Sequence, residues 1–393
     1  MGKESPVLLS RIIQSALPQY QQLYGRLSDY QWKVISTLQK CGTADLGMSI
    51  YRCDTCGDVT VHYHSCRNRH CPKCQGATRG LWIENRKQEL LPVGYYHIIF
   101  TVPQELRPIM LRNKDILYAI LFQAASQTLL TLGRDKKYLN AIIGFMAVLH
   151  TWGQTLIDHP HLHIVIPAGG IRLDKEKWTH CRKDYLFPQQ VVAELYRGKF
   201  LSLLKDAVEK GNVTFRGEIS RYSDPDFFSE LLGDLWKKKW MVYLKPPCNA
   251  PQKAVEYLGR YTSRIAISEK RLISHDDGIV KFRWKDYRQD GKEKIMVLTE
   301  VEFLRRFLLH IVPQQFVRIR YYGFMSNRNK EKNLERCMSL LNVRRERVSL
   351  PTNTVDILML FFGIDVKTCK KCNQGHRQLV ERISNAPPFY RAA

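Results

Sequence analysis

The sequence predicts an α+β fold with a central antiparallel sheet, flanking helices and a small N-terminal module. Helix-like and strand-like segments mix along the 393 residues without the strict β-α-β alternation of a parallel sheet. Residues 279–284 and 294–299 alternate in polarity around a polar turn, which is typical of an antiparallel hairpin. Six of the eleven cysteines crowd into residues 41–74, and this clustering marks off the small module.

Helices are expected where apolar residues recur every three or four positions. In the N-terminal lead-in, Leu23, Leu27, Val34 and Leu38 lie near this spacing. A proline suits the first turn of a helix, which supports a helix start at Pro251. The expected helical segments are 1–40, 76–91, 104–132, 186–210, 251–262 and 300–310.

Strands are expected where short runs of β-branched and aromatic residues end at turn-forming residues. The run that begins at Tyr95 stops at Pro103, and the run that begins at Trp240 stops at Pro246. The expected strands are 95–102, 141–150, 161–166, 240–244, 279–284, 294–299 and 316–322. We divide the chain into a lead-in with the cysteine module (1–92), a central domain (93–310) and a basic C-terminal region (311–393).

The charge of the chain points to a polyanionic partner. The formal net charge is +24, from 61 Lys and Arg against 37 Asp and Glu, so nucleic acid is the leading candidate. No apolar run reaches 18 residues and the N-terminus lacks a signal-peptide core, so we expect a cytoplasmic protein without membrane contact. The chain has no G-x-x-x-x-G-K-[ST] loop, so we expect no nucleotide cofactor.

Two C-x2-C pairs in the cysteine module are typical of a zinc site. Fourteen residues separate Cys53 and Cys56 from Cys71 and Cys74. Two thiolate pairs on tight turns predict one tetrahedral Zn²⁺ site, either purely structural or also touching DNA. Four further residues either complete a second zinc site or are buried bystanders: Cys41, His64, Cys66 and His70.

A third C-x2-C pair lies near the C-terminus. Cys369 and Cys372, with His376 close by, supply only three candidate ligands. They form either a degenerate knuckle or a site that is completed from elsewhere in the chain. The remaining cysteines are most simply buried thiols.

A His-x-His pair lies at the start of the expected strand 161–166. Residues two apart on a strand share a face, so His161 and His163 project together while Leu162 and Ile164 face a core. Two imidazoles on a rigid strand make a half-site for a divalent metal. The alternative is a structural role, because histidines on half-buried strands usually form hydrogen bonds.

A pair of tyrosines lies in the expected helix 251–262. Tyr257 and Tyr261 are four residues apart, so they share one helical face. Such a stripe most often serves packing, but Arg260 and Arg264 make a second pair of this spacing, and that pair favours phosphate contact. A tyrosine oxygen can act as a nucleophile that forms a covalent intermediate.

The order of these motifs resembles the HUH endonuclease superfamily, and within it the two-tyrosine rolling-circle transposases of the insertion sequence 91 (IS91) type. The resemblance rests on the His-Leu-His motif at 161–163, the tyrosine pair, the cysteine-rich run 65–75 and the Tyr-Tyr-Gly-Phe run at 321–324. It extends from about residue 30 to about residue 375. It implies a HUH nuclease domain whose antiparallel sheet carries the histidines and faces the tyrosine helix.

The resemblance also implies a chemistry and its partners. One tyrosine attacks single-stranded DNA at a transposon end, which gives a 5′-phosphotyrosine link and a free 3′-OH, and the other allows a second strand transfer. A Mg²⁺ or Mn²⁺ ion is held by His161, His163 and a third polar ligand, for which we take Gln154, with His159 and Asp158 as alternatives. The implied partners are transposon ends, target DNA and host replication and helicase functions, at a bacterial nucleoid.

Two other functions fit the same motifs. The same chemistry could serve a rolling-circle replication initiator or relaxase, although the zinc module and the order of the motifs argue against this. A non-catalytic zinc-finger regulator would use His161 and His163 only structurally.

Basic and aromatic residues elsewhere are candidates for DNA contact, with a solvated charged face as the alternative for each. Residues 316–347 interleave the two types, as single-strand grooves do, and the cysteine module carries basic residues that suit phosphates. The candidates besides Arg260 and Arg264 are Arg67, Arg69, Lys73, Arg318, Arg320, Tyr321, Tyr322 and Arg328.

Overall fold

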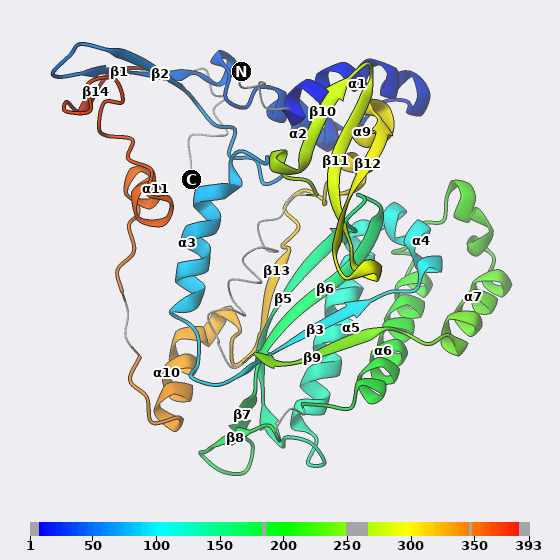
Figure 1. The fold of residues 1–393 in the computed structure, drawn as a ribbon. Coiled ribbons are helices and arrows are strands. Elements are labelled where there is room, and N and C mark those ends of the chain that lie inside the picture. The colour runs from blue at the N-terminus through cyan, green and yellow to red at the C-terminus, as the bar shows by residue number, and fades with distance from the viewer. Residues whose placement is uncertain (1–7, 183–185, 249–265, 346–347, 385–393) are drawn as a thin grey trace.

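The fold is that of a computed structural model, which describes residues 8–182, 186–248, 266–345 and 348–384 (Figure 1). Helices mix with antiparallel sheets, so the α+β class is confirmed. The expected helix 251–262 lies outside the described residues. The sequence did not indicate α7, α10, α11 or β14, all of which are present.

A five-stranded sheet forms the centre of the molecule. Its strand order is β13 (Ile319–Gly323), β5 (Gly144–Trp152), β6 (Asp158–Pro167), β3 (Tyr95–Thr101) and β9 (Val242–Cys248). Every neighbouring pair is antiparallel, as expected. The edge strand β13 comes from the basic C-terminal region, so this region shares a sheet with the central domain.

Helices cover one face of this sheet (Figure 1). They are α4 (Arg107–Arg112), α5 (Lys114–Arg134), α6 (Gln189–Glu209) and α7 (Pro225–Lys237). The core between helices and sheet takes alternate residues of β6, namely Leu162, Ile164 and Ile166. Burial of each such side chain contributes about 1.5–3 kcal/mol, so His161 and His163 are held on the opposite face. By length and composition alone α5 could cross a membrane, but most of its residues are buried in this core.

The N-terminal helices pack against a distant part of the chain. With α9 (Glu300–Leu309), the helices α1 (Leu9–Tyr24) and α2 (Asp29–Gln39) share a core with the sheet β10 (Leu272–Asp276), β11 (Ile279–Asp286) and β12 (Lys292–Thr299). Ser28 begins α2 in a capping box with Gln31, and Thr299 caps α9. Ile35 and Phe303 lie in the shared core.

A third group of elements brings the two ends of the chain together. β1 (Met48–Cys53) lies between β2 (Val59–Tyr63) and β14 (Arg377–Ile383) in a three-stranded sheet. The long helix α3 (Gln75–Lys87) leads from the cysteine module to the central sheet, near α10 (Lys330–Leu340) (Figure 1). The C-terminal segment returns beside α3 through α11 (Thr354–Phe362). A small sheet of β4 (Ala141–Ile142), β7 (Gly169–Arg172) and β8 (Trp178–His180) completes the fold.

Close backbone packing explains the glycine in the Tyr-Tyr-Gly-Phe run. Gly323 ends β13 with a left-handed φ of +60°, and a Cβ atom there would lie 1.7 Å from the carbonyl oxygen of Ile143. Only glycine fits both the backbone conformation and this approach. The preceding Tyr322 stacks on Phe145 with ring centroids 5.2 Å apart, so this part of the run serves the edge of the central sheet.

We predict that Gly323→Ala lowers the free energy of unfolding by about 3 kcal/mol, because left-handed strain and steric overlap add together. Gly211 is the matched control, since its φ is +69° and no atom lies within 4 Å of its Cβ position. Gly211→Ala should cost only about 1 kcal/mol. Urea unfolding followed by tryptophan fluorescence measures both, and equal losses would show that the Ile143 carbonyl moves aside freely.

Candidate metal centres

Three histidines lie together on the face of the central sheet opposite the helices. His161 and His163 come from β6 and His150 from β5, and the strand register places His150 directly opposite His161. One ring nitrogen from each lies within 4.8 Å of the others. The expected same-face placement of His161 and His163 is therefore present, and the sequence missed His150. Its signal was available, since His150 ends the preceding expected strand.

The hydrogen bonds of the rings direct one nitrogen of each β6 histidine into the site. The Nδ1 of His161 lies 2.6 Å from the carbonyl oxygen of His159, so it donates and leaves Nε2 with a free lone pair. The Nε2 atoms of His161 and His163 are 3.1 Å apart. Two ligands at right angles around an ion, each at about 2.1 Å, would lie about 3.0 Å apart. The spacing therefore suits a shared cation.

A fourth histidine supports this arrangement from the next strand. The Nε2 of His97 on β3 lies 2.8 Å from the Nδ1 of His163, and the two rings stack in parallel. If His163 binds a metal through Nε2, its Nδ1 carries the proton and donates to His97. Such partners orient metal-bound histidines and fix their tautomer.

Burial keeps these imidazoles neutral. Burial lowers the pKa of His161 to about 3, with a smaller contribution from His159, and places the pKa of His163 well below its usual value. It also lowers the pKa of His97 to about 4, assisted by Lys245. Neutral rings offer the lone pairs that a metal needs. Imidazole ligands suit first-row transition metals better than Mg²⁺, so Mn²⁺ is the better match of the two expected ions.

None of the three candidates for the third ligand joins the group of His150, His161 and His163, although the ring of His159 lies 5.0 Å from the ring of His161. Gln154 turns towards the β11 strand, where its Oε1 accepts a hydrogen bond from the backbone nitrogen of Lys285 at 3.4 Å. The ring of His159 interacts with Arg107, at 3.1 Å. Asp158 is buried, and this burial raises the pKa of its carboxyl to about 6. The structure thus places His150, and not Gln154, beside His161 and His163.

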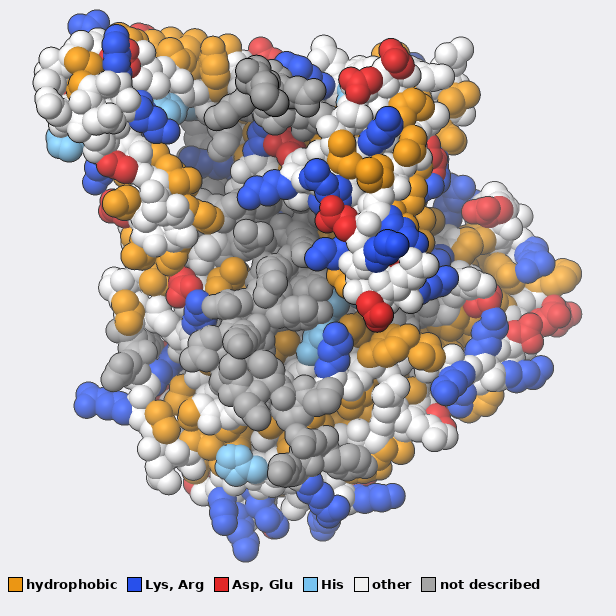
Figure 2. All heavy atoms as spheres, in the orientation of Figure 1, with side chains coloured by type: hydrophobic (Ala, Val, Ile, Leu, Met, Phe, Trp, Pro, Cys, Tyr) orange, Lys and Arg blue, Asp and Glu red, His pale blue; other side chains and the backbone are white. Residues whose placement is uncertain are grey.

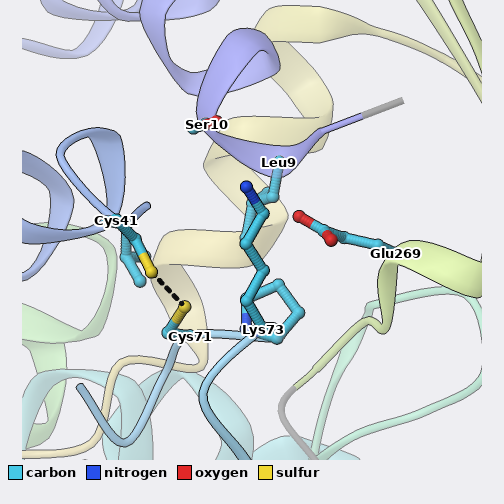
Figure 3. Close-up of a pocket in the computed structure, with 8 residues that line it drawn as sticks. Leu9, Ser10, Cys41, Cys71, Lys73 and Glu269 are labelled. Carbon is cyan, nitrogen blue, oxygen red and sulfur yellow. Dashed lines mark hydrogen bonds between the residues drawn. The ribbon is translucent and has the colours of Figure 1, made fainter. Parts of the chain in front are cut away.

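Four cysteines of the N-terminal module form a compact cluster. Cys41 Sγ lies 3.4 Å from Cys71 Sγ and 3.5 Å from Cys74 Sγ, while Cys66 Sγ lies 3.6 Å from Cys74 Sγ. Figure 3 shows the thiols of Cys41 and Cys71 facing each other beside α1. A disulfide would bring two sulfurs to about 2.05 Å, so these four thiols instead match a metal site with four cysteine ligands.

The expected pairing of the first two C-x2-C knuckles is wrong. Cys53 and Cys56 do not join Cys71 and Cys74 but lie with Cys369 and Cys372. The sequence could not show this, because the partners lie more than 300 residues away and meet only when β14 pairs with β1.

Of the four further zinc candidates, Cys41 and Cys66 join the first cluster and the two histidines do not. The ring of His64 instead contacts Ser49 Oγ at 3.0 Å, and His70 is buried outside the cluster.

The expected DNA-contact residues in the described part of the chain form two groups: exposed residues, and residues whose side chains contact other parts of the protein. Arg67, Lys73 and Arg328 are exposed, and Figure 3 shows the Lys73 side chain directed towards Glu269. The exposed three keep their expected role as a prediction.

The second group takes part in packing and hydrogen bonding within the protein. Arg69 donates to the Phe316 carbonyl at 2.8 Å, and Arg320 lies over the Phe122 ring. Burial lowers the pKa of Arg318 to about 10, with Arg69 contributing. Tyr321 is half-buried and accepts a 2.7 Å hydrogen bond from Arg86. Tyr322 is also half-buried and stacks on a ring of the sheet. In this conformation these side chains join α3, β13 and α5, and their contact with DNA stays a prediction.

The expected nucleophiles lie outside the described residues. Tyr257, Arg260, Tyr261 and Arg264 all fall within 249–265, directly after β9 in the chain. Their roles therefore stay predictions.

Comparisons with known proteins define the class. Residues 12–102 match a family model described as "Transposase zinc-binding domain", and residues 144–333 match one described as "Putative transposase". The chain is 40% identical over 365 residues to "Putative transposase y4qJ" of Sinorhizobium fredii, with 92% of each chain covered. It is 25% identical over 354 residues to "Transposase for insertion sequence element IS801" of Pseudomonas savastanoi pv. phaseolicola, covering 88% of this chain and 83% of that one. No solved structure matches.

These matches show that the protein is a transposase. The chain belongs to the IS91 family of insertion-sequence transposases, with an N-terminal zinc-binding domain. That domain and the cysteine clusters support structural Zn²⁺. The expected family is therefore confirmed.

We predict that His150→Ala weakens Mn²⁺ binding by roughly 100-fold or more, because it removes a direct ligand, whereas even an outer partner costs about 10- to 100-fold. Gln154→Ala is the control and should leave the affinity unchanged. Isothermal titration calorimetry with Mn²⁺ measures both variants after circular dichroism has verified their folding. A loss with Gln154→Ala and none with His150→Ala would reverse the assignment.

Proposed function

We propose that this transposase cleaves and rejoins single-stranded DNA at insertion-sequence ends through 5′-phosphotyrosine intermediates. The observation that carries the proposal is the triad of His150, His161 and His163, whose inward nitrogens suit one divalent cation. A strand-borne histidine pair followed by Tyr257 and Tyr261 is the arrangement that such an enzyme needs.

The triad supplies the phosphate-binding half of the reaction. When bound there, Mn²⁺ or Mg²⁺ would polarise the scissile phosphate and offset the charge that develops on it. His161 is oriented by the His159 carbonyl and His163 by His97, so the two rings keep their geometry while DNA enters and leaves. Because the rings project from a packed sheet, little reorganisation accompanies the reaction.

The tyrosines supply the bond-making half. The Oη of Tyr257 or Tyr261 loses its proton and attacks the phosphorus, so an O–P bond to tyrosine forms as the bond to the 3′-oxygen breaks. The departing strand takes up a proton and leaves as a 3′-OH. Attack of a 3′-OH on the phosphotyrosine reverses these steps and rejoins DNA. The phosphodiester energy is kept in the protein–DNA link, so the reaction needs no nucleotide hydrolysis.

The surface charge is consistent with a DNA strand as the substrate. The chain carries +24, and on the face in Figure 2 Lys and Arg side chains outnumber acidic ones around the central part of the molecule. The exposed Arg67, Lys73 and Arg328 would contact backbone phosphates. We infer that host replication and helicase functions expose the strand, and that the enzyme works in the cytoplasm at the nucleoid.

We predict that the protein with Mn²⁺ forms a detergent-resistant adduct with single-stranded oligonucleotides that carry the element ends. A 3′-end label should migrate with the protein and a 5′-end label should not, because the tyrosine keeps the 5′-phosphate. Tyr257→Phe with Tyr261→Phe should abolish the adduct, and each single change identifies the first nucleophile. His163→Ala should reduce it by roughly 100-fold, since the ion contributes several kcal/mol.

The control is Tyr287→Phe, because Tyr287 is an exposed tyrosine of the β11–β12 connection. It should form as much adduct as the wild type. An adduct that persists in the double tyrosine variant, or one that carries the 5′-end label, would disprove the proposed chemistry.

A further inference from the structure

We propose that Cys53, Cys56, Cys369 and Cys372 bind a second Zn²⁺ ion, which fastens the C-terminal segment of the chain to the N-terminal module. The four thiols come from two knuckles at opposite ends of the sequence, and all lie within 4.8 Å of one another. This site is separate from the first cysteine cluster and from the histidine triad.

The sulfur spacing is that of a tetrahedral zinc site. Cys53 Sγ lies 3.7 Å from Cys372 Sγ, and Cys56 Sγ lies 3.8 Å from Cys369 Sγ. Sulfurs at about 2.3 Å from a tetrahedral Zn²⁺ lie about 3.8 Å apart, whereas a disulfide requires about 2.05 Å. The contacts run between the knuckles, so neither pair could form a closed site without the other.

Both knuckles have the backbone of a metal-binding turn. A residue with left-handed φ follows the second cysteine of each: Gly57 at +69° and Asn373 at +54°. This turn aims backbone N–H groups at sulfur, since Cys56 N lies 3.5 Å from Cys53 Sγ and Gly375 N lies 3.3 Å from Cys372 Sγ. Such N–H groups stabilise a thiolate, which is the form that binds zinc.

The two knuckles are fitted closely to each other. The backbone nitrogen of His376 donates to Asp54 Oδ1 at 2.8 Å, and the backbone nitrogen of Asp54 donates to the His376 carbonyl at 3.0 Å. A Cβ at Gly375 would lie 2.5 Å from Cys53 Sγ, so only glycine allows the approach. His376 takes part through its backbone, and its ring does not belong to the thiol group.

The surrounding sheet needs such a ligand because it lacks a core. None of the three hydrophobic clusters among the described residues includes a side chain of β1, β2 or β14. Several of their apolar side chains are exposed instead: Val59, Val61, Tyr63, Leu379 and Val380. A small sheet that buries so little apolar surface depends on a metal or a cross-link for its stability. Zinc at the four thiols would supply that free energy.

The test counts zinc in the full-length chain carrying His161→Ala, so that the histidine triad does not contribute. We expect two zinc ions per chain by elemental analysis, and one after Cys369→Ser with Cys372→Ser. Cys53→Ser with Cys56→Ser should give the same single loss, and all four changes together should still leave one. If the two knuckles belonged to separate zinc sites, the fourfold variant would lose two zinc ions, and that result would overturn the proposal. A parent chain that holds only one zinc ion would also overturn it.

Two control variants separate this site from general damage. Cys181→Ser removes a thiol outside both clusters, and His376→Ala removes the neighbouring ring, so each should retain two zinc ions. Trypsin should release the segment after α11 from the Cys369 and Cys372 double variant but not from the parent. A parent chain with two zinc ions and an equally cleavable C-terminus would refute the fastening role.

The order of zinc release gives a second readout. Cys56 is exposed and Cys372 partly so, whereas three ligands of the first cluster are buried. A chelator should therefore remove one zinc ion first, and tryptic cleavage of the C-terminal segment should accompany that step. Cleavage that appears only with loss of the second zinc ion would contradict this assignment.

Discussion

The register between β5 and β6 is the constraint on which the candidate nuclease site depends. It places His150 opposite His161 while Leu162 and Ile164 enter the core. A slip by one residue would reverse the faces of a whole strand, so burial of the apolar core enforces the register that brings the histidine triad together. The connecting turn is held by α9, because His310 and Arg306 bond to carbonyl groups of residues 156 and 155.

A buried charge network joins the zinc-binding domain to that sheet. Glu89, just after α3, lies 2.7 Å from Arg86 and 2.6 Å from Lys330 of α10. Arg86 in turn donates to Tyr321 on β13. Glu89 is the counter-charge that both cations share, so its removal would leave Arg86 and Lys330 without a compensating charge. The orientation of α3 relative to the histidine-bearing sheet is therefore fixed by polar contacts at its end.

Local patterns in the sequence predicted what depends on local geometry. The two-residue alternation of side chains along a strand placed His161 and His163 on one face, and the C-x2-C spacing identified the knuckles. The placement of His150 beside His161 depends on which strands pair, and the partners of Cys53 depend on a contact across the whole chain, so neither follows from one motif alone. Tyr321 and Tyr322 show the same limit, because an aromatic beside basic residues has one appearance in sequence whether it stacks on a base or packs inside the protein.

The meeting of the two chain ends at β1 and β14 also imposes an order on synthesis. All four thiols of the first cluster leave the ribosome within residues 41–74 and can close early. Cys53 must wait for Cys372, which lies 319 residues later, or roughly 15–60 s at about 5–20 residues per second. A chain that stops between β13 and Cys369 would retain the strands that carry the histidine triad yet never complete its N-terminal sheet. The sheet that contains the early strands β1 and β2 is thus completed only when β14 has been synthesised.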